Sequence, residues 1–263
     1  MSNHLSLHKT DSSNQSQFRT FNRKVTPKEN ALAVELLHVL DKILTKNKIK
    51  WCLMYGSLAG QLYFHGLIPW DDDWDIMVFA LEKKIVKLLT QFTAENKKFG
   101  FAVHSKDFSK LYHVDSTKAG KYHWKWPFVD IFYGALTDNN VEAYNEKICL
   151  KTEMFPLKRG FFEGLLLPVP RKPFLVLDKL YKSEFGSKCI LGYDHRNEQF
   201  STSEFVECNK LIGKYAWVRN WVRNEGDKEV YVQSLVRNKK EYHRIEIWKD
   251  FKGHLVYQFI DFD

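Results

Sequence analysis

The first helical pattern in the chain begins at residue 26. Thr26 is a candidate N-cap, the proline after it would occupy the first helical position, and Glu29 is placed to complete a capping box. Apolar residues then recur at helical spacing, so we predict a helix that ends near Lys46. Residues 1–24 are rich in Ser, Asn, Gln and His and lack an apolar period. We therefore predict a disordered leader over 1–24 and a single folded domain over 25–263.

A strand, a glycine turn and a short helix follow. Residues 50–55 form a compact apolar run that ends at Gly56-Ser57, and residues 58–64 are typical of a short helix closed by His65-Gly66. A second strand is predicted over 75–79. Beyond it we expect an amphipathic helix over 81–92, strands near 101–104, 111–114 and 128–133, and a helix over 174–185 after a stiff proline-rich connection.

The last third of the chain has a less regular pattern. Apolar positions between 205 and 222 recur at intervals that predict a helix, and alternation over 230–236 and 243–248 predicts a closing hairpin. Both helices and strands are expected, so we assign the chain to the α+β class.

Four acidic residues stand directly before and within the second strand, in the run Asp71-Asp72-Asp73-Trp74-Asp75. In an extended backbone, residues two apart point the same way, so Asp73 and Asp75 share one face while Asp72 points to the other. Two carboxylates on one face repel each other unless a cation neutralises them, and a divalent metal that prefers oxygen ligands is the simplest compensation. The alternative is a solvated turn over Asp71 to Asp73. Asp75 argues against that alternative because it continues the row into an apolar strand.

Asp130 is likewise an acid in an apolar strand, since it is the single charged residue of Phe128-Val129-Asp130-Ile131-Phe132. Alone it would be read as a buried carboxylate bonded to backbone amides. Together with Asp73 and Asp75 it completes a three-carboxylate site for Mg²⁺ or Mn²⁺, which would orient a phosphate for in-line displacement. Gly56-Ser57 would supply helix N–H groups that face the phosphate.

These motifs resemble the LicD/fukutin family. The segments that carry the resemblance are Tyr55-Gly56-Ser57-Leu58-Ala59-Gly60, Gly66 to Asp75, Val129-Asp130-Ile131-Phe132, Phe155-Pro156-Leu157, Phe161-Phe162-Glu163-Gly164 and Leu167-Pro168-Val169-Pro170. The likeness covers roughly residues 30–190 and implies a nucleotidyltransferase-like mixed sheet flanked by helices. One position departs from it, since Tyr63 stands where the family pattern commonly has arginine. Residues after about 195 match no part of the pattern and are treated as a C-terminal extension.

The resemblance implies a transferase that moves a phospho-alcohol, such as phosphocholine or ribitol phosphate, from a CDP-linked donor to a sugar hydroxyl of a glycan. In that reaction Asp73 and Asp75 would hold the metals, and Asp130 would be a third ligand or the base. Gly56, Ser57 and Asp71 would bind the substrate. The alternatives are a nucleotidyltransferase acting on RNA and a catalytically inactive nucleotide-binding module.

Charge and composition narrow the choice of partner and compartment only slightly. The formal net charge of +8 suits a negatively charged partner, although we do not expect nucleic acid to be that partner. No apolar run reaches the roughly 20 residues of a membrane-spanning helix, so we expect a soluble protein, cytoplasmic or, if a targeting segment is missing, in the Golgi lumen. The four cysteines are scattered and are typical of free thiols, with a Cys189–Cys208 bridge as the alternative in an oxidising compartment.

Overall fold

The computed structural model describes residues 20–182, 184 and 186–262. Its first long element is the helix α2 (Pro27–Lys46), whose N-cap Thr26 and capping-box partner Glu29 bond reciprocally as predicted. Most of the predicted leader, residues 1–19, lies outside the described residues. Within its last part, Phe21 is fully buried, so the packed chain begins before residue 25.

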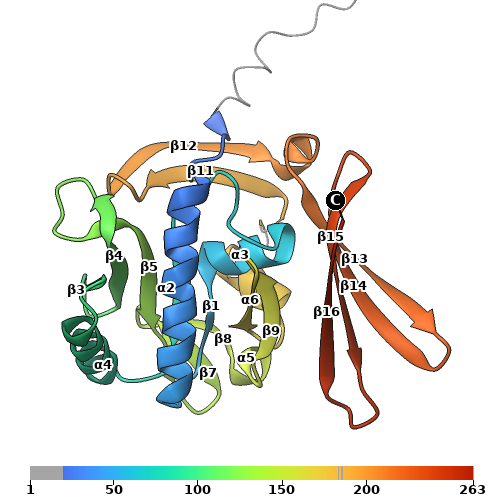
Figure 1. Cartoon of the computed structure of the whole chain (residues 1–263), viewed down its shortest axis with the longest axis horizontal. Coiled ribbons are helices and arrows are strands. Elements are labelled where there is room, and N and C mark those ends of the chain that lie inside the picture. Colours follow the sequence, from blue (N-terminus) through green and yellow to red (C-terminus); the bar gives the residue numbers. More distant parts are fainter. Residues whose placement is uncertain (1–19, 183, 185, 263) are drawn as a thin grey trace, which may run out of the picture.

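A five-stranded mixed sheet forms the centre of the molecule, with the strand order β1-β2-β5-β4-β3. These strands are β1 (Trp51–Leu53), β2 (Trp74–Val78), β3 (Phe99–Val103), β4 (Phe108–Lys118) and β5 (Lys125–Tyr133). β2 and β5 run parallel, and the other neighbouring pairs are antiparallel. The helix α2 packs against β4 and β5 (Figure 1). The helices α3 (Tyr55–Phe64) and α4 (Glu82–Glu95) follow β1 and β2 along the chain. Mixed sheet and flanking helices confirm the α+β class.

Shorter elements follow the sheet along the chain. They are β6 (Ala135–Leu136), β7 (Asn140–Ala143), β8 (Glu146–Leu150), α5 (Lys151–Met154), β9 (Lys158–Phe162), β10 (Leu165–Val169) and α6 (Pro173–Leu180). β9 and β10 form a hairpin, and α6 packs against α3, α5 and β8. The helix α6 corresponds to the one predicted over 174–185 but ends earlier, at Leu180.

The hairpin β11 (Lys188–Asp194) and β12 (Gln199–Glu207) crosses the upper end of the molecule in Figure 1. A disulfide between Cys189 and Cys208 closes its base, so the structure contains the bridge that the sequence left as an alternative. Cys208 begins the 3₁₀ helix η1 (Cys208–Leu211). Cys52 and Cys149 are free and buried.

A second sheet of four antiparallel strands ends the chain. Its strands are β13 (Trp217–Glu225), β14 (Lys228–Arg237), β15 (Lys240–Lys249) and β16 (Leu255–Asp261). β14 and β15 confirm the predicted hairpin. The helix predicted over 205–222 is wrong, because this segment contains the end of β12, η1 and most of β13. β13 pairs with β14 along its whole length, and this cross-strand pairing outweighs an apolar spacing that only mimics a helix.

The second sheet contacts the rest of the molecule through aromatic side chains. The Trp217 ring packs against Phe64 at 4.6 Å and Tyr63 at 5.8 Å between centroids. His65, the left-handed C-cap of α3, bonds through Nδ1 to Nε2 of His243 at 2.7 Å and stacks on its ring. This sheet therefore lies beside the C-terminal end of α3 and the β9–β10 hairpin.

Candidate metal centre

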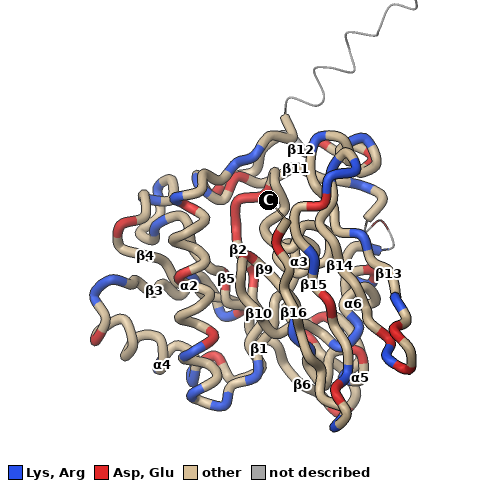
Figure 2. The backbone as a smooth tube through the Cα atoms, turned by 45° about the vertical axis from the view of Figure 1, so that its right-hand side comes forward, with Lys and Arg blue, Asp and Glu red and all other residues tan. Residues whose placement is uncertain are grey.

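The sheet brings together the three acids that the sequence singled out. β2 and β5 pair in parallel with Asp75 directly beside Asp130, and Asp73 lies just before β2 begins. Carboxylate oxygens of Asp73, Asp75 and Asp130 all lie within 4.8 Å of one another, and the residues are 7%, 4% and 4% exposed. Figure 2 shows the acidic run as a long red stretch of chain leading into β2. The predicted convergence of these carboxylates is therefore present in the fold.

The first turn of α3 holds Asp75 in place. The Gly56 backbone N–H donates to Asp75 Oδ2 at 3.1 Å, and the Asp75 backbone N–H donates to Ser57 Oγ at 2.8 Å. A Cβ on Gly56 would lie 2.8 Å from Asp71 Oδ2 and 3.4 Å from Asp75 Oδ2, so only glycine leaves room for both carboxylates. Gly56 and Ser57 thus bond to the acidic strand. Their contact with a donor phosphate stays a prediction.

The loop that leads into the acidic run is anchored by Glu163. Its Oε1 accepts from the Leu67 backbone N–H at 2.7 Å, and its Oε2 accepts from the Asn30 side chain at 2.8 Å. A Cβ on Gly66 would lie 2.3 Å from Glu163 Oε1, so this contact requires a glycine there. The β9–β10 turn and α2 thus fix the chain just before Asp71.

Asp72 points away from the three-carboxylate cluster, as the alternation predicted, but it is buried and bonded. It accepts from His195 Nδ1 at 3.0 Å, and from the backbone N–H groups of His195 and Arg196 at 3.1 and 3.3 Å. Lys24 Nζ lies 3.4 Å from its Oδ1. Burial raises the pKa of Asp72, but these bonds outweigh burial and leave that pKa below its usual value. Asp72 is therefore an anchor for the β11–β12 turn.

His195, which the sequence did not single out, lies in that turn and bridges two of the acids. Its Nδ1 bonds to Asp72 and its Nε2 lies 3.3 Å from Asp73 Oδ2. Burial lowers the pKa of His195, but the carboxylates of Asp73, Asp72 and Asp71 outweigh burial and raise it to about 10. Ligand atoms of His195, Asp71 and Asp73 also lie within 4.8 Å of one another. Nothing in the sequence near residue 195 predicted this position.

Lys110 is the second residue that sequence reasoning missed. It is 1% exposed, and its Nζ donates to Asp130 Oδ1 at 2.8 Å and Oδ2 at 3.0 Å. The same Nζ lies 3.1 Å from Glu198 Oε1 and 3.5 Å from the centroid of the Phe128 ring. Lys110 and Asp130 are opposite each other in the β4–β5 register. β4 carries several other polar side chains, so Lys110 did not stand out in the sequence.

The centre carries more negative charge than its cations balance. Burial raises the pKa of Asp75 to about 7, with the Asp130 and Asp71 carboxylates adding to it. Burial and the neighbouring carboxylates raise the pKa of Asp71 and Asp73 well above the usual range as well. Burial also raises the pKa of Asp130, although Lys110 opposes that rise. A cluster of buried carboxylate oxygens with this excess charge fits a hard divalent cation such as Mg²⁺ or Mn²⁺.

A cavity of about 480 Å³ adjoins the cluster at Asp71 and Gly56. Its wall includes Tyr63 and Trp217, and Lys182 and Lys188 supply positive charge. Tyr63, which stands where the family pattern commonly has arginine, packs its ring against Phe174 and Trp217. Among the described residues that line this cavity, Lys182 and Lys188 are the basic ones, and Lys188 pairs with Glu184 of the same lining.

No helix in the described part of the chain combines the length and the apolar character that crossing a membrane requires.

Comparisons with known proteins place this centre inside a recognised domain. Residues 48–172 match the family model described as LicD/FKTN/FKRP, nucleotidyltransferase domain. An uncharacterized protein of Rickettsia typhi is 25% identical over 194 residues, and one of Rickettsia prowazekii is 25% identical over 181 residues. These alignments take in 72% and 65% of this chain, but the chain spans only 58% and 62% of the length of these relatives. All three cluster acids fall within residues 48–172, the part of the chain that is similar to the LicD/FKTN/FKRP nucleotidyltransferase domain.

Proposed function

We propose that this protein is a metal-dependent transferase that moves a phospho-alcohol group of the phosphocholine or ribitol-phosphate type. The donor would be a CDP-linked alcohol and the acceptor a sugar hydroxyl of a glycan. The observation that carries the proposal is the buried trio Asp73, Asp75 and Asp130, which lies inside the LicD-type domain. The unit β1–α3–β2, with acids at the start of β2 and on the adjacent parallel strand, supports a nucleotidyltransferase-like arrangement of that domain.

Each residue of the centre has a role in this reaction. A divalent ion, when bound, would neutralise phosphate oxygens and orient them for in-line displacement. Asp73 and Asp75 would hold it, and the Gly56 N–H keeps Asp75 in its place. Asp130 is a third ligand or the base that takes the proton of the acceptor hydroxyl. Since both oxygens of Asp130 accept from Lys110, the ligand role suits its geometry better.

The transfer balances without a further reactant. The acceptor hydroxyl oxygen forms a bond to the donor phosphorus, the bond from that phosphorus to the CMP oxygen breaks, and CMP leaves with the electron pair. The hydroxyl proton passes to a carboxylate of the centre or to water. The cavity beside Asp71 is the place for the donor, with Lys182 and Lys188 near its phosphates.

The decisive assay is release of CMP from a panel of CDP-alcohols, measured with Mg²⁺, Mn²⁺ or EDTA. We expect metal-dependent release that Asp75→Asn lowers by on the order of 10²-fold. Asp138→Asn, at an exposed site outside the centre, is the matched control and should keep full activity.

Two other outcomes would contradict the proposal and indicate a different function. Metal-dependent nucleotide binding with no CMP release from any donor would indicate an inactive binding module. Incorporation of nucleotide into RNA, with tight and salt-sensitive polynucleotide binding, would indicate a nucleotidyltransferase acting on RNA.

A further inference from the structure

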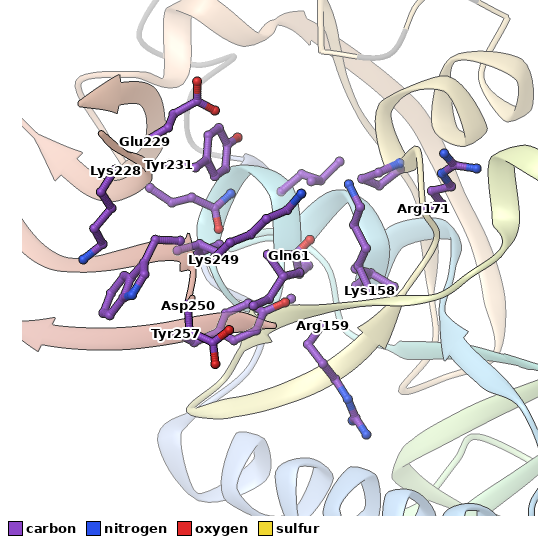
Figure 3. Close-up of a pocket in the computed structure, with 18 of the residues that line it drawn as sticks. Gln61, Lys158, Arg159, Arg171, Lys228, Glu229, Tyr231, Lys249, Asp250 and Tyr257 are labelled. Carbon is purple, nitrogen blue, oxygen red and sulfur yellow. The ribbon is translucent and has the colours of Figure 1, made fainter. Parts of the chain in front are cut away.

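A cleft of about 1300 Å³ separates the β9–β10 hairpin from the C-terminal sheet. One wall is built by α3, β9, β10 and the start of α6, and the other by β14, β15 and β16. Figure 3 shows charged side chains from both walls around this space. The second wall lies outside residues 48–172, so the cleft combines the LicD-type domain with a part of the chain that the family model does not cover.

Besides Lys228, which lies over the Trp248 ring, three cations of this cleft have no carboxylate partner among the described residues. They are Lys158, Arg171 and Lys249, all exposed. In Figure 3, Lys249 extends from the sheet toward the side on which Lys158 lies. Arg159 differs, since it pairs with Asp41 at 3.5 Å and points away from the cleft. Unpaired cations on facing walls repel each other, and an anionic ligand between them would relieve that repulsion.

The positive surface continues beyond the cleft. A neighbouring cavity of about 760 Å³ shares Lys158 and Arg171 and adds Lys48 and Lys50. No aspartate or glutamate is among the described residues that line this second cavity. The positive surface therefore extends over two adjoining cavities, which suits an extended ligand with several negative groups.

The cleft also contains groups that a polynucleotide would not favour. Glu229 and Asp250 lie on the sheet side in Figure 3, and Glu225 and Asp227 line the same wall. Carboxylates bond well to sugar hydroxyls but repel a chain that carries a phosphate on every residue. Trp248 and Tyr231 add aromatic surface for sugar rings. From this combination we infer that the cleft binds the acceptor, an extended glycan with anionic groups at intervals.

The cleft and the cavity at the acidic centre border the same elements. Gln61 and Phe174 line the cleft, whereas Tyr63 and Leu180 of the same two helices line the cavity beside Asp71. β13 begins at the cavity with Trp217 and ends at the cleft with Glu225. A strand of this length covers roughly 30 Å. A glycan whose end reacts at the centre would thus reach the cleft with its following sugars. This inference rests on the proposed function and names its acceptor.

The test compares binding of four probes by isothermal titration at two salt concentrations. They are a hyaluronan decasaccharide, a neutral dextran oligosaccharide of similar length, a 20-nucleotide single-stranded RNA, and CMP with Mg²⁺. We expect the wild type to bind hyaluronan at low salt, more weakly at high salt, and more tightly than dextran or RNA. The variant Lys158→Gln/Arg171→Gln/Lys249→Gln should bind hyaluronan at least 10-fold more weakly. Its CMP binding should stay unchanged.

The matched control is Lys83→Gln/Lys84→Gln/Lys87→Gln on α4, where the same net charge is lost at exposed positions away from the cleft. It should bind hyaluronan within 2-fold of the wild type. Equal losses in the two variants, or absence of hyaluronan binding, would overturn the inference. Tighter binding of RNA would assign the cleft to nucleic acid, and equal binding of dextran would remove the anionic requirement. Failure of CMP with Mg²⁺ to bind would count against the proposed function instead.

Discussion

Replacing Asp75 by asparagine should stabilise the metal-free protein, whereas the same replacement at Asp72 should destabilise it. Asp75 is buried beside other carboxylates, and its pKa of about 7 lies well above the ordinary 3.8. Each unit of this difference corresponds to about 1.4 kcal/mol, so keeping Asp75 ionised at pH 8 costs roughly 4 kcal/mol. A neutral amide avoids that cost but weakens the bond from the Gly56 N–H by about 1 kcal/mol. The net gain expected is therefore about 2–3 kcal/mol.

Asp72 has the opposite environment three residues away. Its carboxylate accepts from the His195 ring, from two backbone N–H groups and from Lys24, and its pKa is lowered. An amide turns one of these acceptors into a donor that faces other donors. Loss of such charge-assisted bonds should cost roughly 3 kcal/mol.

Urea unfolding at pH 8 in EDTA, followed by tryptophan fluorescence, measures both changes. The expected order of stability is Asp75→Asn, then wild type, then Asp72→Asn, with similar m-values for all three. With Mg²⁺ at about one hundred times its Kd, the wild type should gain about 2.7 kcal/mol and Asp75→Asn much less.

The pH dependence checks the same reasoning. Because the folded pKa of Asp75 is raised, the folded state binds its proton more tightly than the unfolded state. This group therefore makes the metal-free wild type lose stability as pH rises from about 4 to 7, and Asp75→Asn should lack that loss. A less stable Asp75→Asn in EDTA, or an equal Mg²⁺ response in this variant, would refute a metal centre at Asp75.

Three further predictions concern the contact between α3 and the second sheet and the supports of the centre. Burial and His243 lower the pKa of His65 to about 3. The unfolded state therefore binds a proton that the folded state does not, and the free energy of unfolding should fall by about 2 kcal/mol between pH 6.5 and pH 5. His65→Asn should reduce this pH dependence in unfolding experiments. The disulfide closes the hairpin that carries His195. Cys208→Ser should therefore lower the free energy of unfolding in urea by about 3 kcal/mol and weaken Mg²⁺ binding. Unchanged stability and Mg²⁺ affinity would mean that the hairpin keeps its position without the disulfide. Gly56→Ala should displace the acidic side chains and weaken Mg²⁺ binding about 10-fold or more by calorimetry, with a fold that circular dichroism finds intact.

The sequence alone determined the features that depend on near neighbours in the chain. The capping box at Thr26 fixes the start of α2 because its two bonds join residues three apart. The alternation around Asp73 and Asp75 places them on one face because strand geometry sets the direction of successive side chains. Asp130 stood out for the same local reason, as an acid in an apolar strand.

Tertiary structure decided everything that depends on residues far apart in the chain. The parallel register of β2 and β5 sets Asp75 beside Asp130, and no local pattern specifies that register. Lys110 and His195 reach the centre through cross-strand pairing and through the β11–β12 hairpin, so their roles appear only when the chain is folded. The segment after residue 205 misled for the same reason. Its last part, β13, bonds to β14, and that long-range pairing, rather than the apolar spacing of the segment, makes it a strand.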